Sequence, residues 1–421
     1  MLAKKRRMGD LQEQLASLRE RMARAAASCD QKIAVRAAEA KAAFRHVEEW
    51  LSGEEVSTGL GCHFETEKLY ESHRRHGSAE IASLAGLPPD LLESLSIANA
   101  PPEEWAFLDT ETTGLAGGTG TCAFLVGVGR ITADGFRVRQ FFMRDYGEEA
   151  SLLDALTRHL KPFRVLITYN GRAYDQPLLE TRYRLNRARP PFAAMDHLDL
   201  LHGARRLWKL RFESCRLVDL ENAILGVERH GDMPGALIPY LYFEYLQTRH
   251  AARMLPVFEH NAIDILTLAC LTGIVPYAFK DPASAPLKHG AEMAGIARWL
   301  REAGEPEQAL ALFRRAIDTG LPDDLLFRTL WDVGMLERKL GGDALLVWND
   351  LAAARNPFRL KALEELAKHY EHEERDYSKA LQLTRQALEL EDSEGLRKRE
   401  ERLIRRGAAA ERPRRTPRRL R

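Results

Sequence analysis

The central part of the chain alternates short apolar runs with amphipathic segments. The sequence WAFLD at 105–109 predicts a buried strand that ends in a carboxylate. The run CAFLVGVGRI at 122–131 and the segment 136–143 predict two strands joined by a turn. The same patterns predict helices at 148–160 and 173–185, strands at 164–169 and 193–200, and mainly helix from 213 to 275. Strands with helices between and after them predict an α/β fold, with a mixed sheet flanked by helices.

The N-terminal region has the pattern of an amphipathic helix. Four apolar residues recur at spacings of four, three and four between Leu11 and Met22, and no Pro or Gly interrupts the chain from there to Leu51. We expect this stripe to pack on the rest of the protein; pairing with a partner helix or lying on an anionic surface are the alternatives. Residues 1–51 are therefore expected to form a basic amphipathic helix, and 52–104 a lead-in segment with turn signals.

A second type of pattern covers residues 290–391. Ala309, Ala344 and Ala380 stand in matching contexts, 35 and 36 residues apart, and two prolines 35 residues apart each precede a new helical stretch. A small residue at the crossing of a helix pair, repeated with a period near 34, resembles tetratricopeptide repeats. The alternative is an unrelated helical bundle. We expect the sheet domain at 105–280 and an all-α repeat domain at 290–391.

The composition limits the class of protein. Of the 421 residues, 45% are hydrophobic, which suffices for a sizeable core and excludes a wholly disordered chain. No run approaches the roughly 20 apolar residues of a membrane span, and no apolar stretch follows the basic N-terminus, so neither a span nor a cleaved signal peptide is expected. The five cysteines contain no CxxC pair, which argues against a disulfide framework or zinc ribbon and suits a cytoplasmic location.

Positive charge is concentrated at the two ends of the chain. Residues 1–24 carry a net charge of +4 and residues 397–421 a net charge of +9, so the 372 residues between them carry −12. Basic ends on an acidic body are typical of polyanion binding, although a solubilising tail is the alternative. Because prolines interrupt the Arg-rich segment 397–421, we expect it to be disordered.

The clearest candidate chemistry lies at the end of the 105–109 strand. Asp109 and Glu111 are two residues apart, so on a strand both side chains point to the same face. Two adjacent carboxylates repel each other unless a cation neutralises them, and hard cations such as Mg²⁺ or Mn²⁺ prefer oxygen ligands. Taken alone, an Asp-x-Glu pair is a weak signal.

Two further elements carry acidic residues in suitable places. Asp175 lies in the first turn of a predicted helix, after a buried strand that ends at Asn170. His260 and Asp264 are four residues apart and share one face of a later helix. Each element has a structural explanation: a favourable helix dipole for Asp175 and a helix-face pair for His260 and Asp264. Their occurrence in this order in one chain is much more specific than any one of them.

The three segments DTETTG, YNGRAYDQPLL and HNAID resemble the three motifs of the DEDD exonuclease superfamily, which has a ribonuclease-H-like fold. The full pattern is closer to the bacterial YprB-like ribonuclease-H-fold proteins. It also includes DHLDLL, ARRLWK, SCRLVDLE and DMPGALIP, and it covers about residues 55–275. That family can carry tetratricopeptide-like repeats at its C-terminal side.

The resemblance implies a site for two Mg²⁺ or Mn²⁺ ions. Asp109, Glu111 and Asp264 would hold one ion, and Asp109 and Asp175 a second. One departure concerns the catalytic base. Exonucleases of this class have His five residues, or Tyr four residues, before the last Asp, whereas His260 stands four residues before Asp264. His260 is expected either to orient or deprotonate the attacking water or to be a helix-face partner of Asp264.

Other residues are candidates for contact with nucleic acid. Thr112, Thr113 and Gly114 would let the backbone approach a terminal nucleotide, and Asn170 would contact sugar or phosphate. A basic stretch around an aromatic ring would hold the backbone and stack a base; it consists of Arg205, Arg206, Trp208 and Lys209. The alternative for this stretch is an amphipathic helix with a solvated face. Asp196 and Asp199 lie near the motifs but are not expected to be ligands.

The favoured interpretation is a metal-dependent 3′–5′ exonuclease acting on DNA or RNA. Two alternatives remain open: a catalytically silent nucleic-acid platform that recruits a partner through the repeats, and a structure-selective endonuclease. The repeats are expected to form a concave surface for a protein partner.

Overall fold

The computed structural model describes residues 47–114, 120–229 and 231–410, except for the side chains of the last two. These residues form two compact units. The first, here called the sheet unit, contains residues 47–205 and 214–281; the second, the helical unit, contains 206–213 and 282–410. The N-terminal helix expected over 1–51 lies almost entirely outside the described residues, which begin with a short 3₁₀ helix, Val47–Glu49.

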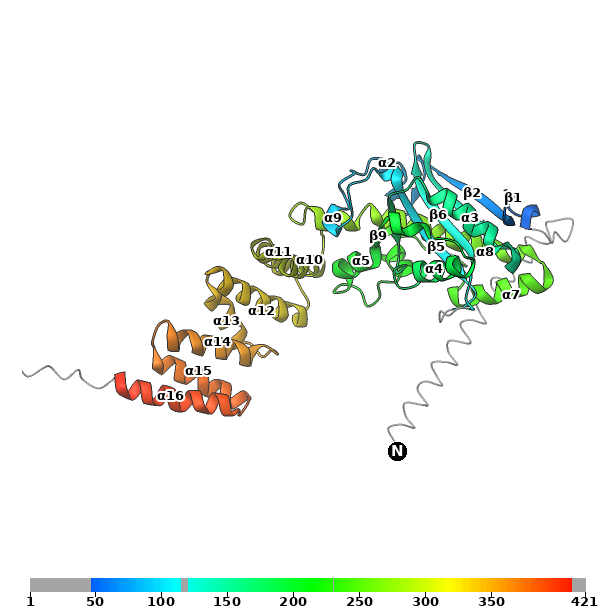
Figure 1. Cartoon of the computed structure of the whole chain (residues 1–421). Helices are drawn as coiled ribbons and strands as arrows, with labels where there is room; N and C mark the ends of the chain where they lie inside the picture. Colours follow the sequence, from blue (N-terminus) through cyan, green and yellow to red (C-terminus); the bar gives the residue numbers. More distant parts are fainter. Residues whose placement is uncertain (1–46, 115–119, 230, 411–421) are drawn as a thin grey trace, which may run out of the picture. The chain divides into compact units, whose positions relative to one another are not determined.

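The sheet unit contains a seven-stranded mixed sheet in the order β1-β2-β7-β6-β5-β8-β9 (Figure 1). The strands are β1 (Gly53–Thr58), β2 (Gly61–Glu71), β5 (Trp105–Thr112), β6 (Ala123–Thr132), β7 (Gly135–Phe142), β8 (Val165–Thr168) and β9 (Asp196–Asp199). β5, β8 and β9 are parallel to one another, whereas the pairs on the other side of β5 are antiparallel. This arrangement confirms the expected mixed α/β sheet.

The sheet begins earlier in the chain than the sequence suggested. β1 and β2 fall within the expected lead-in segment, yet β2 pairs with β7 along eight positions, from Phe64 opposite Phe142 to Glu71 opposite Gly135. The charged residues of β2 interrupt the apolar pattern by which a strand is predicted. One of them, Glu65, is nevertheless buried, and its charge is compensated by His63 and Arg139. We expected the sheet domain to start at residue 105, but its first strand, β1, already begins at Gly53.

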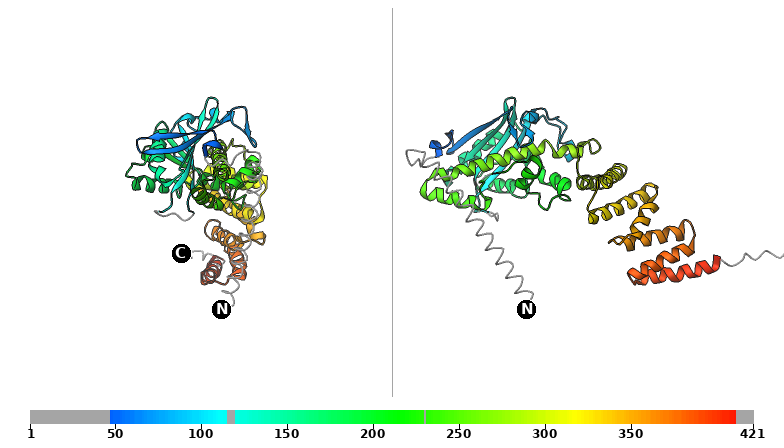
Figure 2. Two further views of the ribbon diagram at one scale, coloured as in Figure 1. Left: turned by 90° about the vertical axis from the view of Figure 1, so that its right-hand side faces the viewer. Right: turned by 180° about the vertical axis from the view of Figure 1, so that it is seen from behind.

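Helices cover both faces of the sheet (Figure 1, Figure 2). The helices of this unit are α2 (Ala82–Ala85), α3 (Glu149–Leu160), α4 (Asp175–Leu185), α6 (Leu217–Leu220), α7 (Ile238–Thr248), α8 (Leu255–Thr272) and α9 (Val275–Lys280), together with the first six residues of α5 (Leu200–Trp208). α8 contacts β5, β6 and β7, and α3 contacts β1, β2 and β7. Residues 251–280 are long and apolar enough to cross a membrane, but 72% of their most apolar window is buried in the protein, as expected for a core helix.

Two glycines of β6 let α8 lie close to the sheet. A Cβ atom at Gly127 would lie 2.2 Å from Oδ1 of Asn261 and 2.3 Å from a methyl carbon of Ile265. At Gly129 it would lie 2.5 Å from Ile265. All three distances are far below van der Waals contact, so larger residues would push the helix away. The glycines therefore allow α8 to bring its polar residues to β5.

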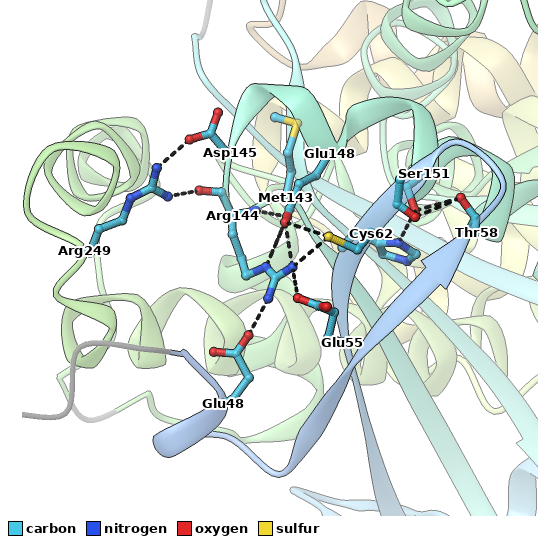
Figure 3. Close-up of polar contacts among 12 residues, drawn as sticks. Glu48, Glu55, Thr58, Cys62, Met143, Arg144, Asp145, Glu148, Ser151 and Arg249 are labelled. Carbon is cyan, nitrogen blue, oxygen red and sulfur yellow. Dashed lines mark hydrogen bonds and ion pairs between the residues drawn. The ribbon is translucent and has the colours of Figure 1, made fainter.

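A cluster around Arg144 fastens the start of the described chain to the sheet (Figure 3). Arg144 follows β7, and its guanidinium lies 2.6 Å from Glu48, 2.7 Å from Glu55 and 2.6 Å from Glu148. These carboxylates belong to the first 3₁₀ helix, to β1 and to the turn before α3. The arginine side chain is only 16% exposed, so its ion pairs are weakly screened by solvent. The cluster thus holds three segments together at the end of β7.

The helical unit fits the expected repeats. Its helices are α10 (Gly290–Ala303), α11 (Pro306–Thr319), α12 (Asp323–Leu340), α13 (Ala344–Ala353), α14 (Arg359–His372), α15 (Tyr377–Leu390) and α16 (Glu394–Ala410). Helices adjacent in sequence contact one another from α10 to α16. Ala309, Ala344 and Ala380 each lie in the second helix of a pair and are buried, at 0%, 5% and 0% exposure. These three positions are buried between packed helices, where there is room only for a small side chain.

The expected disorder of 397–421 is wrong for its first part, because residues up to 410 continue α16. Glu371 on α14 is 1% exposed, and Arg402 donates two hydrogen bonds to it, at 2.7 and 2.9 Å. Arg406 donates a third, at 2.9 Å. A buried carboxylate requires such partners, so these arginines anchor the helix rather than remaining free for a polyanion. Residues 411–421 lie outside the described part of the chain.

Candidate active site

β5 brings two carboxylates to the edge of the core. The strand is buried from Trp105 to Leu108 and half-buried from Asp109 onward. Asp109 lies opposite Gly127 of β6, and Glu111 points to the same face two residues later. The alternation of the strand places Thr110 on the opposite face. This confirms that the two acids share a face, as their spacing predicted.

Asp175 reaches the site from the first turn of α4. Thr110 Oγ1 donates a 2.5 Å hydrogen bond to Asp175 Oδ1, which links α4 to β5. The loop before the helix is held by Asp199, whose carboxylate accepts hydrogen bonds from the backbone N–H groups of Asn170 at 2.8 Å and Arg172 at 3.2 Å. Asn170 has a φ of 68°, in the left-handed region that Asn tolerates better than most residues. Asp199 therefore shapes the loop, and its charge adds to the rise in the pKa of Asp175.

α8 brings the third motif against β5. Asn261 Nδ2 donates a 2.8 Å hydrogen bond to Asp109 Oδ2 and a longer one, 3.3 Å, to the Asp109 carbonyl oxygen. Asn261 is held in turn by Gln140 of β7, whose Nε2 donates to Asn261 Oδ1 at 2.9 Å and to the Phe258 carbonyl at 2.8 Å. This chain of amides orients Asp109.

Asp264, one turn after Asn261 on the same helix, is paired with Arg229. Arg229 Nη2 donates a 2.5 Å hydrogen bond to Asp264 Oδ1. The same guanidinium contacts Asp232 Oδ2 at 3.2 Å and Glu221. Glu221 is fully buried and also accepts a 2.8 Å hydrogen bond from Thr267. Arg229 is therefore held between the acidic site and a buried polar network.

His260 lies between two carboxylates. Its Nδ1 is 2.9 Å from Asp232 Oδ1, and its Nε2 is 3.6 Å from Asp264 Oδ2. Burial acts to lower the pKa of His260, but the hydrogen bond to Asp232 and the charges of Asp264 and Glu111 raise it to about 9. The imidazolium form thus predominates at neutral pH. This geometry favours the helix-face partnership over a water-activating base at that pH.

The four predicted carboxylates, Asp109, Glu111, Asp175 and Asp264, are close enough to affect one another electrostatically, and we call them the acid cluster. Burial and the charges of Asp264, Glu111 and Asp175 raise the pKa of Asp109 well above its ordinary range. Burial also raises the pKa of Glu111 to about 8, with Asp264 and Asp175 adding to the rise and His260 opposing it. Burial raises the pKa of Asp175 to about 6, against the hydrogen bond from Thr110. The fold therefore concentrates negative charge at one point.

The donor set of the acid cluster fits a divalent cation. It consists of carboxylate oxygens, which hard cations prefer, and the causes that raise or lower the pKa of the Glu111 carboxyl include no hydrogen bond from another described side chain. Within that part of the chain, no three His, Cys, Asp or Glu side chains already stand as a metal-binding group. Arg229 occupies Oδ1 of Asp264, and Thr110 occupies Oδ1 of Asp175. The cluster thus fits a metal chemically, and individual side chains must turn to coordinate it.

The segment after β5 is folded onto β6 by hydrogen bonds. Thr113 N–H donates to the Cys122 carbonyl at 3.0 Å, and Thr113 Oγ1 accepts from Cys122 N–H at 3.1 Å. Thr112 Oγ1 donates to the Gly114 carbonyl at 2.9 Å. The hydroxyl groups of Thr112 and Thr113 therefore stabilise this segment. Gly114, three residues after Glu111, is half-buried.

The basic stretch at 205–209 is divided between the two units. It belongs to α5 (Leu200–Trp208) and the residue after it, and only Arg205 falls in the sheet unit, where its charge lowers the pKa of Tyr169 against the effect of burial. Arg206 and Lys209 are exposed in the helical unit. Trp208 is 2% exposed, so its ring is not available to stack a base. The stretch is an amphipathic helix with a solvated basic face, and the predicted stacking role of Trp208 is wrong.

Several site residues were not singled out from the sequence. Arg229, Asp232, Asn261 and Thr110 all contact members of the acid cluster or His260. Asn261 lies inside the HNAID segment, and Asp232 begins the DMPGALIP segment. Their presence in the motifs was a signal, but their roles depend on contacts between distant parts of the chain.

The geometry agrees with comparisons to known proteins. A family model of the RNase_H superfamily matches residues 106–275, which contain all four carboxylates of the acid cluster. The chain belongs to this superfamily, within the group of proteins that resemble YprB. It is 33% identical over 328 residues to a protein of Bacillus subtilis (strain 168) described as "Uncharacterized protein YprB", covering 76% of this chain and 78% of that relative. The sheet unit therefore contains a ribonuclease H-like nuclease domain, and nucleases with this fold typically use divalent metals.

Proposed function

We propose that the chain is a metal-dependent 3′–5′ exonuclease that hydrolyses phosphodiester bonds of DNA or RNA. The supporting observation is the convergence of the acid cluster. Its members come from β5, α4 and α8. Burial raises the pKa of Asp109, Glu111 and Asp175, and the charges of other members raise those of Asp109 and Glu111 further. Such an arrangement opposes the stability of the unliganded protein, which favours a functional explanation for it.

The side chains divide the proposed work. Asp109, Glu111, Asp175 and Asp264 are the residues that would hold a pair of divalent cations, with Asp109, Glu111 and Asp264 serving one ion and Asp109 and Asp175 the other. The chemistry that a bound Mg²⁺ or Mn²⁺ pair supplies is activation of the attacking water and stabilisation of the leaving 3′ oxygen. Asn261 and Thr110 keep two of the carboxylates in place through the hydrogen bonds described above.

His260 is proposed to orient the attacking water, and to accept its proton only in the fraction of molecules in which the imidazole is neutral. Thr112, Thr113 and Gly114 form the turn beside which the terminal nucleotide is proposed to lie. Asn170, in the loop that Asp199 supports, and Arg205 on α5 are proposed to contact the sugar–phosphate backbone.

The proposal is tested with 5′-labelled single- and double-stranded DNA and RNA, in Mg²⁺, Mn²⁺ or EDTA. We expect a metal-dependent ladder that shortens from the 3′ end and that is lost in Asp109→Asn. The matched control is Asp154→Asn, which removes an exposed acid on α3 that pairs with Arg158. Full activity in Asp109→Asn would refute the assignment of the site.

The same assay separates the alternatives. Discrete internal fragments would identify an endonuclease. Binding without cleavage under any metal condition would identify a nucleic-acid platform. In either case the helical unit is proposed to hold a protein partner, because stacked helix pairs offer an extended surface for one.

A further inference from the structure

Arg229 places a permanent positive charge against the acid cluster. Its guanidinium contacts Asp264 Oδ1 at 2.5 Å and Asp232 Oδ2 at 3.2 Å, and it also pairs with Glu221. Only 6% of the side chain is exposed. Because a guanidinium stays protonated in proteins, this charge does not depend on pH.

The position of Arg229 is fixed by Glu221, a buried carboxylate that has partners of its own. Glu221 is 0% exposed, and its Oε1 accepts a 2.8 Å hydrogen bond from Thr267 and lies 3.0 Å from Nε2 of His76. His76 comes from β3 (Arg75–His76), which pairs with β4 (Ala79–Glu80). The carboxylate that holds Arg229 is therefore itself locked by groups on two other elements. This differs from an exposed ion pair, whose side chains exchange freely with water.

Arg229 and a divalent cation require the same carboxylate. Asp264 gives its Oδ1 to Arg229, and its Oδ2 lies 3.6 Å from His260 Nε2. A cation that binds Asp264 must share it with a fixed positive charge nearby, and like charges at such separations repel strongly in a partly buried site.

We propose that Arg229 is the resident counter-cation of Asp264 and competes with a divalent metal ion for that carboxylate. This inference rests on the proposed function, because it takes Asp264 to be a metal ligand. Arg229 thereby stabilises the cluster without a metal and weakens its affinity for one. It acts through Asp264 and is a positioning residue.

The consequence is a change in how strongly metal stabilises the protein. Without Arg229, the carboxylates of Asp264, Asp232 and Glu221 lose their shared positive partner. A buried charge that loses its partner is strongly destabilising, and a divalent cation then relieves a larger repulsion. A ligand that binds only the folded state raises the unfolding temperature more as its affinity increases.

The test is thermal unfolding of the full chain without nucleic acid, in EDTA and in increasing Mn²⁺ or Mg²⁺. For Arg229→Met we expect an unfolding temperature about 5–10 °C below wild type in EDTA. We also expect a metal-induced rise at least about twice that of wild type, in line with tighter binding. Arg229→Lys, which keeps the charge, should show a metal-induced rise close to that of wild type.

The matched control is Arg182→Met. Arg182 is 16% exposed and pairs with Glu149 at 2.6 Å, and neither residue belongs to the acid cluster. It should lower the unfolding temperature while leaving the metal-induced rise unchanged. An equal or smaller rise in Arg229→Met than in wild type would overturn the inference, as would an enlarged rise in Arg182→Met.

Asp109→Asn separates this inference from the proposed function. If it abolishes the metal-induced rise while Arg229→Met leaves that rise at the wild-type value, the metal site stands and the role of Arg229 is refuted. If metal shifts neither wild type nor Arg229→Met, the metal site and the inference both fail.

Discussion

Asn261 on α8 donates a hydrogen bond of 2.8 Å to the carboxylate of Asp109 on β5, across 152 positions of sequence. Gln140 on β7 holds the other end of the same amide at 2.9 Å. The side-chain amide of Asn261 therefore joins three elements, β5, β7 and α8. A metal ligand must be held within a narrow range of orientations. We therefore regard the hydrogen bonds from Gln140 to Asn261 and from Asn261 to Asp109 as part of the candidate site.

Replacing Asn261 with Ala should therefore impair the site without unfolding the protein. Loss of a partner that orients a metal ligand typically lowers activity or metal affinity by about 10–100-fold. We expect this loss in kcat/KM on a labelled oligonucleotide and in the affinity for Mn²⁺. Asn349→Ala is the control, since the Asn349 side chain is exposed and donates a hydrogen bond to the carbonyl of Leu345 within α13. Wild-type values in Asn261→Ala would contradict the orienting role.

Gly127 provides a test of the close approach of α8. A methyl group there would lie 2.2 Å from Asn261 Oδ1 and 2.3 Å from Ile265. Because the core cannot absorb it without movement, we expect Gly127→Ala to lower the free energy of unfolding by about 1–3 kcal/mol. Activity should fall by more than the fraction of protein that unfolds, because Asn261 must move away from Gly127 and its hydrogen bond to Asp109 is then disturbed. Gly147→Ala, where a Cβ would meet nothing within 4 Å, should leave the unfolding curve and activity nearly unchanged.

Much of the fold followed from local patterns. The strand from Trp105 and the hairpin β6–β7 were predictable because their apolar runs end at turn residues with well-understood geometry. The common face of Asp109 and Glu111 followed from the period of a strand. These features depend only on neighbours in sequence, which is why the sequence alone was sufficient.

The missed features depend on tertiary contacts. Glu65 breaks the apolar pattern of β2, and it is tolerated in the core partly because Arg139, on the neighbouring strand β7, compensates its charge. No local pattern connects these two residues. The basic neighbours of Trp208 in the sequence led to the prediction that its ring stacks a base. Only the packing of the folded protein shows that Trp208 lies on the buried face of its helix. Arg229 stands in a segment between helices, and nothing near it in sequence indicates that its partner is Asp264.

The role of His260 can be decided from the pH dependence of the rate. If His260 is a base, its pKa of about 9 predicts a wild-type rate that rises with pH up to about that value. His260→Ala should then remove this limb of the profile. If His260 only holds Asp232 and Asp264, the variant should be slower at every pH with the shape retained. His202→Ala, an exposed residue of α5, is the control for loss of an imidazole.

Removal of residues 411–421 tests whether the tail binds a polyanion. This deletion removes six arginines and one glutamate but retains Arg402 and Arg406, which anchor α16 to Glu371. The salt dependence of binding to a single strand should become shallower by about 0.7 for each phosphate group that the tail neutralises in the intact protein. A variant of full length with the six arginines changed to Gln should behave like the deletion. An unchanged slope in both would count against the tail.

The stability of the protein in chelator should fall as pH rises, and Glu111 gives the clearest test. The pKa of Glu111 is raised by burial from 4.5 to about 8, so between these values the folded state binds the proton more tightly than the unfolded state. His260 acts in the same direction, because its stabilising contribution is complete below its ordinary pKa of 6.5 and is lost as pH rises through about 9.

Both groups therefore predict that the unfolding temperature in EDTA declines between about pH 5 and pH 9, since stability falls wherever the folded state holds more protons. Glu111→Gln should flatten this decline, because an amide cannot ionise, and Mg²⁺ should flatten it in the wild type by neutralising the ionised cluster. Glu103→Gln, at an exposed position before β5, should retain the wild-type slope. A wild-type unfolding temperature that is constant or rises over this range would show that the acid cluster does not carry the repulsion inferred from its geometry.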